Sequence, residues 1–346
     1  MGVDIGSLLV KHPIGFDSLQ GRRVAIDAYN TIYQFLSTIR QRDGTPLMDS
    51  KGRITSHLSG LLYRVSNMVE MDIRPIFVFD GEPPKFKQKT IEKRQAQKAE
   101  SQRKLEEAIS RGEKELKTYA QGTVRLTGEI IDESKALLDM MGIPVVQAPS
   151  EGEAEASRMV NEGLAYAVGS QDYDSILFGA TRLARNLTLS GRRKLPSKGV
   201  WVEVEPELID SAESLKALGI DRRKLVWAAI MIGTDYYEGV KGIGPKKGLA
   251  IVQKSSSLKE SFELAKAGES YGQNEAELEE IERFFMEPPK PKDEPHIRFK
   301  EPDKDRIMDF MCGQHEFMIE RVETALAKMS KKEDVKGQSK LEGWFG

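Results

Sequence analysis

The chain has 346 residues, of which 39% are hydrophobic and 31% are charged, and its formal net charge of −2 argues against a uniformly basic nucleic-acid binder. No apolar run approaches the roughly 20 residues that a membrane-spanning helix needs, and the first residues lack the basic and apolar regions of a secretory signal. A single cysteine, Cys312, excludes an intramolecular disulfide. We therefore expect a protein of a reducing compartment, the cytoplasm, with no membrane partner.

Apolar stretches alternate with helical patterns along the chain. Residues 24–27 and 76–80 have the composition of buried strands, and each stretch ends in an aspartate. Residues 85–118 are helix-forming but have no wide apolar stripe, so we expect them to stand partly away from the core. Further along we expect helices at 129–141 and 151–161, strands at 145–146 and 165–168, and mainly helices from residue 206.

Strands that alternate with helices predict an α/β fold with a mainly parallel central sheet flanked by helices. Ligands of such sheets bind at the carboxyl ends of the strands. Acidic side chains occur at or just beyond the predicted strands and the helices that follow them: Asp27, Asp80, Glu151, Glu153, Asp172, Asp174 and Asp235.

In a parallel sheet these carboxylates would converge at one edge, where they repel one another strongly unless cations lie among them. Ligands that are all oxygen select hard ions such as Mg²⁺ or Mn²⁺, and the sequence has no His and Cys set suited to zinc. Two such ions roughly 4 Å apart can activate water and stabilise the leaving oxygen of a phosphodiester.

The carboxylates also have structural interpretations. A single aspartate at a strand end is usually a turn former or a helix cap. Ser150 and Glu153 have the spacing of a capping box, and Asp172 with Asp174 fits a solvated loop. Their joint occurrence in one α/β core favours a metal site, while spacing alone leaves both interpretations open.

Positive charge is concentrated in residues 85–104, which hold eight Lys and Arg against two acids. Lys87 and Arg94 lie about two helical turns apart, so both can face the carboxylates from one side and hold a phosphate there. A solvated helix face is the alternative, and charge alone favours it. Tyr33, six residues after Asp27, would lie near the metal ions, although an aromatic on an amphipathic helix is more often part of the core.

Residues 239–247 form a glycine-rich turn between two apolar segments. Gly242 and Gly244 allow the turn to expose backbone N–H groups to a phosphate, and the N-terminus of the next helix adds its dipole. Lys246 and Lys247 add positive charge. The pattern predicts a helix-hairpin-helix element that binds duplex DNA without sequence preference, and an ordinary glycine turn is the alternative.

The C-terminal residues combine a polar stretch with an apolar end. Residues 330–337 contain little apolar material, which predicts a flexible segment. Leu341 and Trp344 lie three residues apart, on one face of a short 3₁₀ turn, and Phe345 lies beside them. Packing of this segment on the body of the protein is the alternative to binding a partner.

These ordered motifs resemble those of the flap endonucleases, structure-specific 5′-nucleases of DNA replication and repair. The resemblance runs along essentially the whole chain, through residues 24–28, 33–36, 78–84, 148–155, 171–174, 233–236 and 242–248. It implies that the seven carboxylates named above are the family's active-site set. They would hold two Mg²⁺ ions, for which Mn²⁺ can substitute.

The resemblance also assigns roles to the remaining residues. Lys87 and Arg94 match the catalytic basic pair of the helical arch through which the single-stranded flap passes, and Tyr33 matches the tyrosine on which a base stacks. In relatives the hairpin grips duplex phosphates and often holds K⁺ through backbone carbonyls. The C-terminal pattern resembles the peptide with which replication proteins bind the sliding clamp, the proliferating cell nuclear antigen, and its residues are Gln338, Leu341, Trp344 and Phe345.

The expected function is Mg²⁺-dependent hydrolysis of 5′ flaps in branched DNA, with 5′→3′ exonuclease action on nicked or gapped duplexes, by an enzyme that is monomeric on its own. The expected segments are an N-terminal nuclease segment with the start of the arch, the rest of the arch, an internal nuclease segment with the hairpin, a helical C-terminal part and a flexible tail: residues 1–105, 106–128, 129–260, 261–329 and 330–346.

Two other functions remain open at this point. A catalytically silent DNA-junction or clamp-binding module is disfavoured, because binding alone would gain from the loss of negative charge. A related 5′-exonuclease or excision-repair enzyme is disfavoured by the short interval between Asp80 and Glu151. The chain ends one residue after Phe345, without the basic extension common in eukaryotic relatives, so we expect an archaeal, nucleoid-associated cytoplasmic protein.

Overall fold

The computed structural model describes residues 2–41, 44–110, 125–188, 192–194 and 201–330. The predicted clamp-binding residues at 338–345 and arch residues 111–124 lie outside this part of the chain. The strands are β1 (His12–Pro13), β2 (Arg23–Asp27), β3 (Arg74–Phe79), β4 (Val145–Gln147), β5 (Ala167–Gly169), β6 (Arg182–Arg185), β7 (Arg192–Lys194), β8 (Trp201–Glu203) and β9 (Glu207–Asp210).

Helices surround these strands. The α-helices are α1 (Ala28–Thr38), α2 (Ser56–Glu70), α3 (Gln88–Ser110), α5 (Gly128–Met140), α6 (Gly152–Asn161), α7 (Asp174–Leu177), α8 (Ser211–Leu218), α9 (Arg222–Ile232), α10 (Pro245–Val252), α11 (Leu258–Leu264), α12 (Gly268–Met286), α13 (Lys304–Met308) and α14 (Ile319–Ser330). The other helical segments are η1 (Phe16–Leu19), η2 (Lys85–Lys87) and η3 (Asp309–Gln314). No helix among the described residues is both long and apolar enough to cross a bilayer.

One seven-stranded sheet in the described part of the chain has the order β1-β9-β6-β5-β2-β3-β4. The strands from β6 to β4 are parallel, and β9 and β1 join antiparallel at one edge. The predicted α/β fold with a mainly parallel sheet is confirmed. The strands β1, β6 and β9 were not predicted, because β1 has only two residues and charged residues stand at both ends of β6 and β9, so no apolar stretch marks them.

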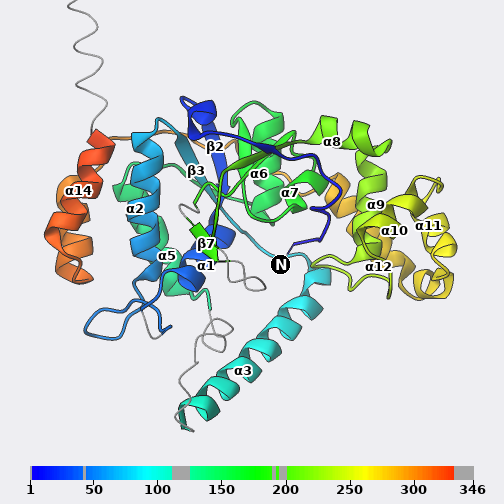
Figure 1. The fold of residues 1–346 in the computed structure, drawn as a ribbon, viewed down its shortest axis with the longest axis horizontal. Coiled ribbons are helices and arrows are strands. Elements are labelled where there is room, and N and C mark those ends of the chain that lie inside the picture. The colour runs from blue at the N-terminus through cyan, green and yellow to red at the C-terminus, as the bar shows by residue number, and fades with distance from the viewer. Residues whose placement is uncertain (1, 42–43, 111–124, 189–191, 195–200, 331–346) are drawn as a thin grey trace, which may run out of the picture.

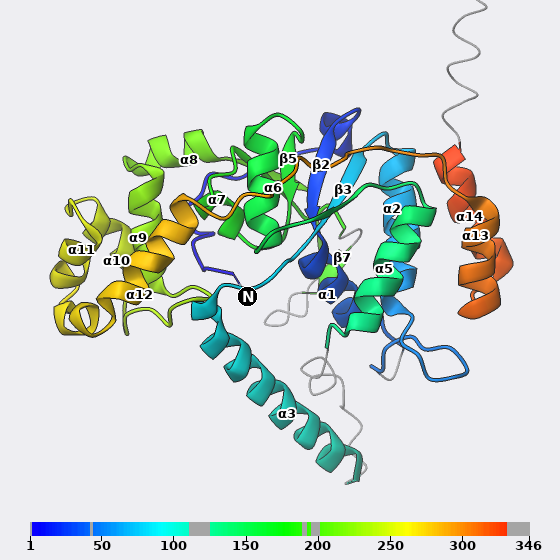
Figure 2. The same cartoon turned by 180° about the vertical axis from the view of Figure 1, so that it is seen from behind.

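The central strands are apolar on both faces because helices cover both. Ala25, Ile76 and Val78 belong to a core shared with α6, α9 and α12. The alternate residues, including Ile26 and Phe77, belong to a second core with α1, α2, α5 and α14. Figures 1 and 2 show α9 to α12 gathered at one end of the molecule and α2, α5 and α14 at the other.

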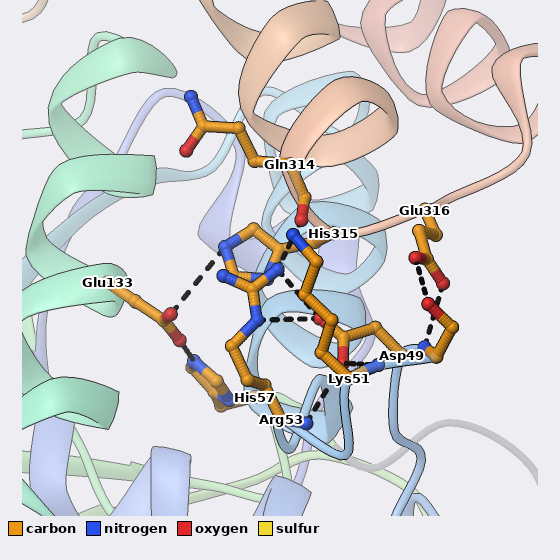
Figure 3. A network of polar contacts seen from close by, with 9 residues as sticks. Asp49, Lys51, Arg53, His57, Glu133, Gln314, His315 and Glu316 are labelled. Carbon is orange, nitrogen blue, oxygen red and sulfur yellow. Dashed lines mark hydrogen bonds and ion pairs between the residues drawn. The ribbon is translucent and has the colours of Figure 1, made fainter.

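A polar network, buried at its two histidines and partly exposed elsewhere, joins the loop before α2 to the segment before α14 (Figure 3). Glu133 of α5 lies between two imidazoles, with 2.9 Å from Oε2 to His57 Nε2 and 3.5 Å from Oε1 to His315 Nε2. Arg53 donates to the backbone carbonyl of Gln314. Both histidine Nδ1 atoms are buried without a hydrogen-bond partner. A proton added to Nδ1 of His315 would be an unsatisfied buried donor, and burial lowers the pKa of this residue.

Candidate active site

The first carboxylates come from neighbouring parallel strands. Asp27 is the last residue of β2 and the N-cap of α1, where Oδ1 accepts a hydrogen bond from Asn30 N at 3.0 Å. Asp80 directly follows β3, and its Oδ1 accepts from Gly152 N at 2.7 Å. This bond ties the end of β3 to the start of α6. It also requires a close approach, since a Cβ on Gly152 would lie 2.7 Å from Asp80 Oδ1.

Glu151 and Glu153 begin α6, but no capping box forms there. Glu151 is the N-cap residue and makes no side-chain cap hydrogen bond. Ser150 Oγ instead donates to the backbone carbonyl of Glu82 at 3.0 Å. The capping-box interpretation is therefore wrong, because the helix starts one residue later than that pattern requires. Neither carboxylate is used in a capping box, so both can contribute to a site at the edge of the sheet.

The remaining carboxylates reach the site from loops. Asp172 follows β5, and its backbone N donates to Ser170 Oγ at 3.2 Å. Asp174 begins α7 and is buried, so the solvated-loop interpretation of this pair does not hold for it. Its Oδ1 accepts from Val3 N at 2.8 Å, which brings the N-terminal segment onto the site. Asp235 lies in the turn after α9.

Burial and mutual repulsion raise the pKa values of four of these carboxylates. Burial and repulsion from Asp80 raise the pKa of Asp27 well above its usual value. Burial and Glu151 raise the pKa of Asp80 to about 6. Burial and Asp174 raise the pKa of Glu153 well above its usual value. Burial raises the pKa of Asp174 to about 7, with Asp235 and Asp172 adding repulsion.

The donor set fits divalent cations. All the side chains are carboxylates, and Glu153 Oε1 is buried without a hydrogen-bond partner. In the described part of the chain, no three His, Cys, Asp or Glu side chains close around a single point. We attribute this spacing to the repulsion between the acids, because carboxylates converge only when cations compensate their charge. Positive charge reaches the cluster instead from two basic residues.

Lys87 and Arg94 provide that charge. Lys87 Nζ donates to both oxygens of Glu151, at 2.7 and 2.6 Å, and Arg94 Nη2 donates to Asp235 Oδ1 at 2.5 Å. Burial opposes the charge of Lys87, but Glu151, Asp80 and Asp235 raise its pKa above the usual value. The alternative of a solvated helix face is wrong for these two residues, which face the carboxylates as their spacing predicts.

An aromatic cluster anchors the base of the arch. The ring of Phe86 in η2 packs edge-on against Tyr236 and Phe284, with centroids 5.2 and 5.3 Å apart. Tyr236 directly follows Asp235, so the same contact fixes the loop that carries this carboxylate. Figure 1 shows α3 extending from this point away from the body, as its polar composition predicts.

Tyr33 lies on α1, the helix that Asp27 caps, and 40% of its surface is exposed. It is therefore not a core residue, and the core interpretation is wrong. An exposed ring on the helix that begins at the carboxylates is open to contact with a ligand.

The glycine-rich turn joins α9 to α10 as a helix-hairpin-helix element. Gly239 and Gly242 have φ of 84° and 83°, which favours glycine. A Cβ on Gly239 would also lie 2.6 Å from Ile232 O. Gly244 is the N-cap of α10, with Pro245 at N1, and space surrounds its Cα. Lys246 and Lys247 are exposed beside the helix N-terminus, and Lys247 Nζ donates to Gly242 O at 3.1 Å.

Comparisons with known proteins agree with this geometry. Residues 7–101 match the model of the XPG N-terminal domain, and residues 142–235 match that of the XPG I-region. The chain is 51% identical to flap endonuclease 1 of Thermococcus onnurineus, over 100% of this chain and 99% of the relative. It is 49% identical to flap endonuclease 1 of Archaeoglobus fulgidus, over the full length of both.

The chain belongs to the flap endonuclease family.

Solved structures agree with this membership. The flap endonuclease-1 structure from Methanococcus jannaschii matches with a TM-score of 0.73 and 38% identity, covering 95% of this chain and 98% of that one. The catalytic core of Rad2 in complex with a DNA substrate matches with a TM-score of 0.66 and 25% identity, covering 94% and 97%. The chain is thus a structure-specific, divalent-metal-dependent nuclease of 5′ flaps that hydrolyses phosphodiester bonds in DNA replication and repair. Hydrolysis with two metal ions is general to this family.

The structure brings further residues to the flap endonuclease site that the sequence did not single out. Asn30 and Ser170 contact the carboxylate cluster directly, and Val3 does so through its backbone. Asn30 lies three residues after Asp27, which caps the helix, and this spacing indicates the contact between its backbone N and Asp27. It does not indicate the contact between its side chain and Asp172. The contact of Ser170 is local as well, because its hydroxyl accepts from a backbone N–H two residues further along the chain. The contact of Val3 with Asp174 joins segments 171 residues apart, and no local pattern indicates it.

Proposed function

We propose that Asp27, Asp80, Glu151, Glu153, Asp172, Asp174 and Asp235 hold two Mg²⁺ ions, for which Mn²⁺ can substitute, at the base of a 5′ flap. The observation that supports this proposal is a set of buried, mutually repelling carboxylates at the carboxyl ends of neighbouring parallel strands and the helices that follow them, with a lysine and an arginine paired to two of the seven. A protein that only bound DNA would gain nothing from so much buried negative charge.

The chain's own residues bind and orient the DNA. Ions held by the carboxylates would supply an activated water and stabilise the leaving oxygen. Lys87 and Arg94, which pair with Glu151 and Asp235 in the structure, would bind the scissile phosphate and offset the charge that develops there. Tyr33 stacks on the base beside the cleavage point.

The hairpin binds the duplex part of the DNA at a distance from the cleavage point. Gly242 and Gly244 allow phosphate to approach backbone N–H groups, Lys246 and Lys247 supply charge, and backbone carbonyls of the turn hold K⁺. All of these contacts are with the backbone of DNA, so specificity comes from the shape of the branched substrate. The same active site also removes nucleotides 5′→3′ at nicks and gaps.

The C-terminal residues Gln338, Leu341, Trp344 and Phe345 bind the sliding clamp, and the enzyme itself is a monomer that works in the cytoplasm at the nucleoid. The chain accordingly divides into an N-terminal nuclease segment with the start of the arch, the rest of the arch, an internal nuclease segment with the hairpin, a helical C-terminal part and a clamp-binding tail: residues 1–105, 106–128, 129–260, 261–329 and 330–346. Removal of residues 338–346 abolishes clamp binding in calorimetry and leaves flap cleavage without the clamp intact. Unchanged clamp affinity, or loss of cleavage without the clamp, would contradict this role.

The decisive experiment compares end-labelled flap, nicked and single-stranded DNAs with and without Mg²⁺. We expect Mg²⁺-dependent cleavage of the flap at its base and slower release of nucleotides from the nick. Preference for the nick over the flap would favour a 5′-exonuclease. Binding without cleavage at any Mg²⁺ or Mn²⁺ concentration would favour a catalytically silent junction-binding module.

A further inference from the structure

Asn30 bridges two of the carboxylates that come from different strands. It is the third residue of α1, and its backbone N donates to Asp27 Oδ1 at 3.0 Å. Its side-chain Nδ2 donates to Asp172 Oδ2 at 2.8 Å. Its Oδ1 faces the backbone N of Gln171 at 3.4 Å. One residue therefore contacts the helix cap and the loop after β5 at the same time.

Tertiary structure places these two segments side by side. Strands β2 and β5 are parallel neighbours, with Ile26 paired to Gly169. Asp27 and Asp172 therefore leave the same edge of the sheet on adjacent strands, and their charges repel. The Asn30 amide gives Asp172 a fixed partner and so limits its rotamers.

The chemistry of the amide determines its orientation. With Nδ2 towards the carboxylate and Oδ1 towards an N–H, both contacts are attractive, while the flipped amide would make both repulsive. Asn30 lines a cavity of about 10 Å³ together with polar residues such as Thr31 and Ser170 and apolar residues such as Leu187. This volume is at the lower limit for one water molecule. If Asn30 is replaced by a side chain of the same shape, the cavity has no room for the water molecules that would be needed to make both hydrogen bonds of the amide.

We propose that Asn30 is a positioning residue, which orients Asp172 relative to Asp27 and so sets the spacing of two carboxylates for a divalent ion. This role rests on the proposed assignment of Asp27 and Asp172 as metal ligands. A residue that orients a ligand through a hydrogen bond typically changes metal affinity or activity by about 10–100-fold when it is replaced.

The test removes the amide and keeps its shape. Asn30→Leu has the same branching without the donor. Gln34→Met is the matched control, because Gln34 is one turn further along α1 and its Oε1 accepts from Thr188 Oγ1 at 2.7 Å, away from the carboxylates. Mn²⁺ binding to the DNA-free protein is measured by calorimetry. Flap cleavage is then measured under single-turnover conditions as a function of Mg²⁺ concentration.

We expect Asn30→Leu to weaken Mn²⁺ binding about 10–100-fold and to raise the Mg²⁺ concentration for half-maximal rate by a similar factor. Saturating Mg²⁺ should restore most of the rate, while Gln34→Met should behave as the wild type. Unchanged Mn²⁺ affinity in Asn30→Leu, or an equal loss of rate at every Mg²⁺ concentration, would overturn the role. If the Leu variant does not fold, Asn30→Ala is subject to the same comparison.

A parallel measurement on Asp172→Asn separates this inference from the proposed site. If Asp172→Asn binds Mn²⁺ and cleaves DNA normally, the assignment of the carboxylates fails and Asn30 has no ligand to position. If Asp172→Asn is inactive and Asn30→Leu binds Mn²⁺ normally, only the role of Asn30 fails.

Discussion

Replacement of Asp174 by asparagine should stabilise the metal-free protein and abolish its activity. Asp174 is buried, and its pKa is raised from the ordinary 3.8 to about 7. Each unit of pKa corresponds to about 1.4 kcal/mol, so the ionised carboxylate destabilises the folded state by roughly 4 kcal/mol above pH 7. An asparagine Oδ1 can still accept from Val3 N, which donates to Asp174 Oδ1 at 2.8 Å in the wild type.

The sign of the pH dependence follows from the raised pKa. Below pH 3.8 the carboxyl is protonated in the folded and the unfolded state, and the folded state is not penalised. As pH rises from 3.8 towards 7, the unfolded state releases its proton first, so the wild type loses stability. The advantage of Asp174→Asn should therefore grow from about 2 kcal/mol at pH 5 to roughly 4 kcal/mol at pH 8.

Urea unfolding of both proteins in EDTA at pH 5 and pH 8 measures this difference. Burial lowers the pKa of His315, so this residue destabilises the protein as pH falls below 6.5, but both proteins carry it and its effect cancels. Saturating Mg²⁺ should remove the advantage, because the ions compensate the charge that the substitution deletes. Equal stability of the two proteins at pH 8 in EDTA, or a difference independent of pH, would refute the reasoning.

Three further predictions concern cleavage and binding. Asp172→Asn should nearly abolish single-turnover cleavage in Mg²⁺. Its affinity for flap DNA should equal or exceed that of the wild type, because the carboxylate that is lost also repels phosphate. Near-normal turnover of the variant would contradict this prediction. Lys87→Ala and Arg94→Ala should each slow the chemical step by roughly 100-fold or more, with smaller effects on affinity, and equal losses in both would mean general phosphate attraction. Gly244→Val should fold normally, since space surrounds this residue, but weaken duplex affinity across a salt titration; normal affinity would make the hairpin purely structural.

The sequence alone predicted the type of sheet, and the resemblance of its motifs to the flap endonucleases predicted the class of reaction. The apolar stretches at β2 and β3 end in Asp27 and Asp80, and in a parallel sheet such ends must meet at one edge. The seven-residue spacing of Lys87 and Arg94 allowed both to face the carboxylates from one side, although charge alone favoured a solvated face, and in the structure each pairs with one carboxylate. These features could be predicted because strand composition and helix periodicity are each visible within one short stretch of sequence.

Only the tertiary structure decided which neighbours act on each carboxylate. The sheet order places β5 beside β2, and that pairing alone brings Asn30 to Asp172, 142 residues away. The same long-range packing seats Val3 on Asp174 and leaves Glu151, rather than Ser150, as the cap of α6. Hydrogen bonds between distant segments depend on the order of the strands in the sheet and on the residue at which each helix begins. A sequence pattern does not determine the strand order, and it does not place a helix end to within one residue.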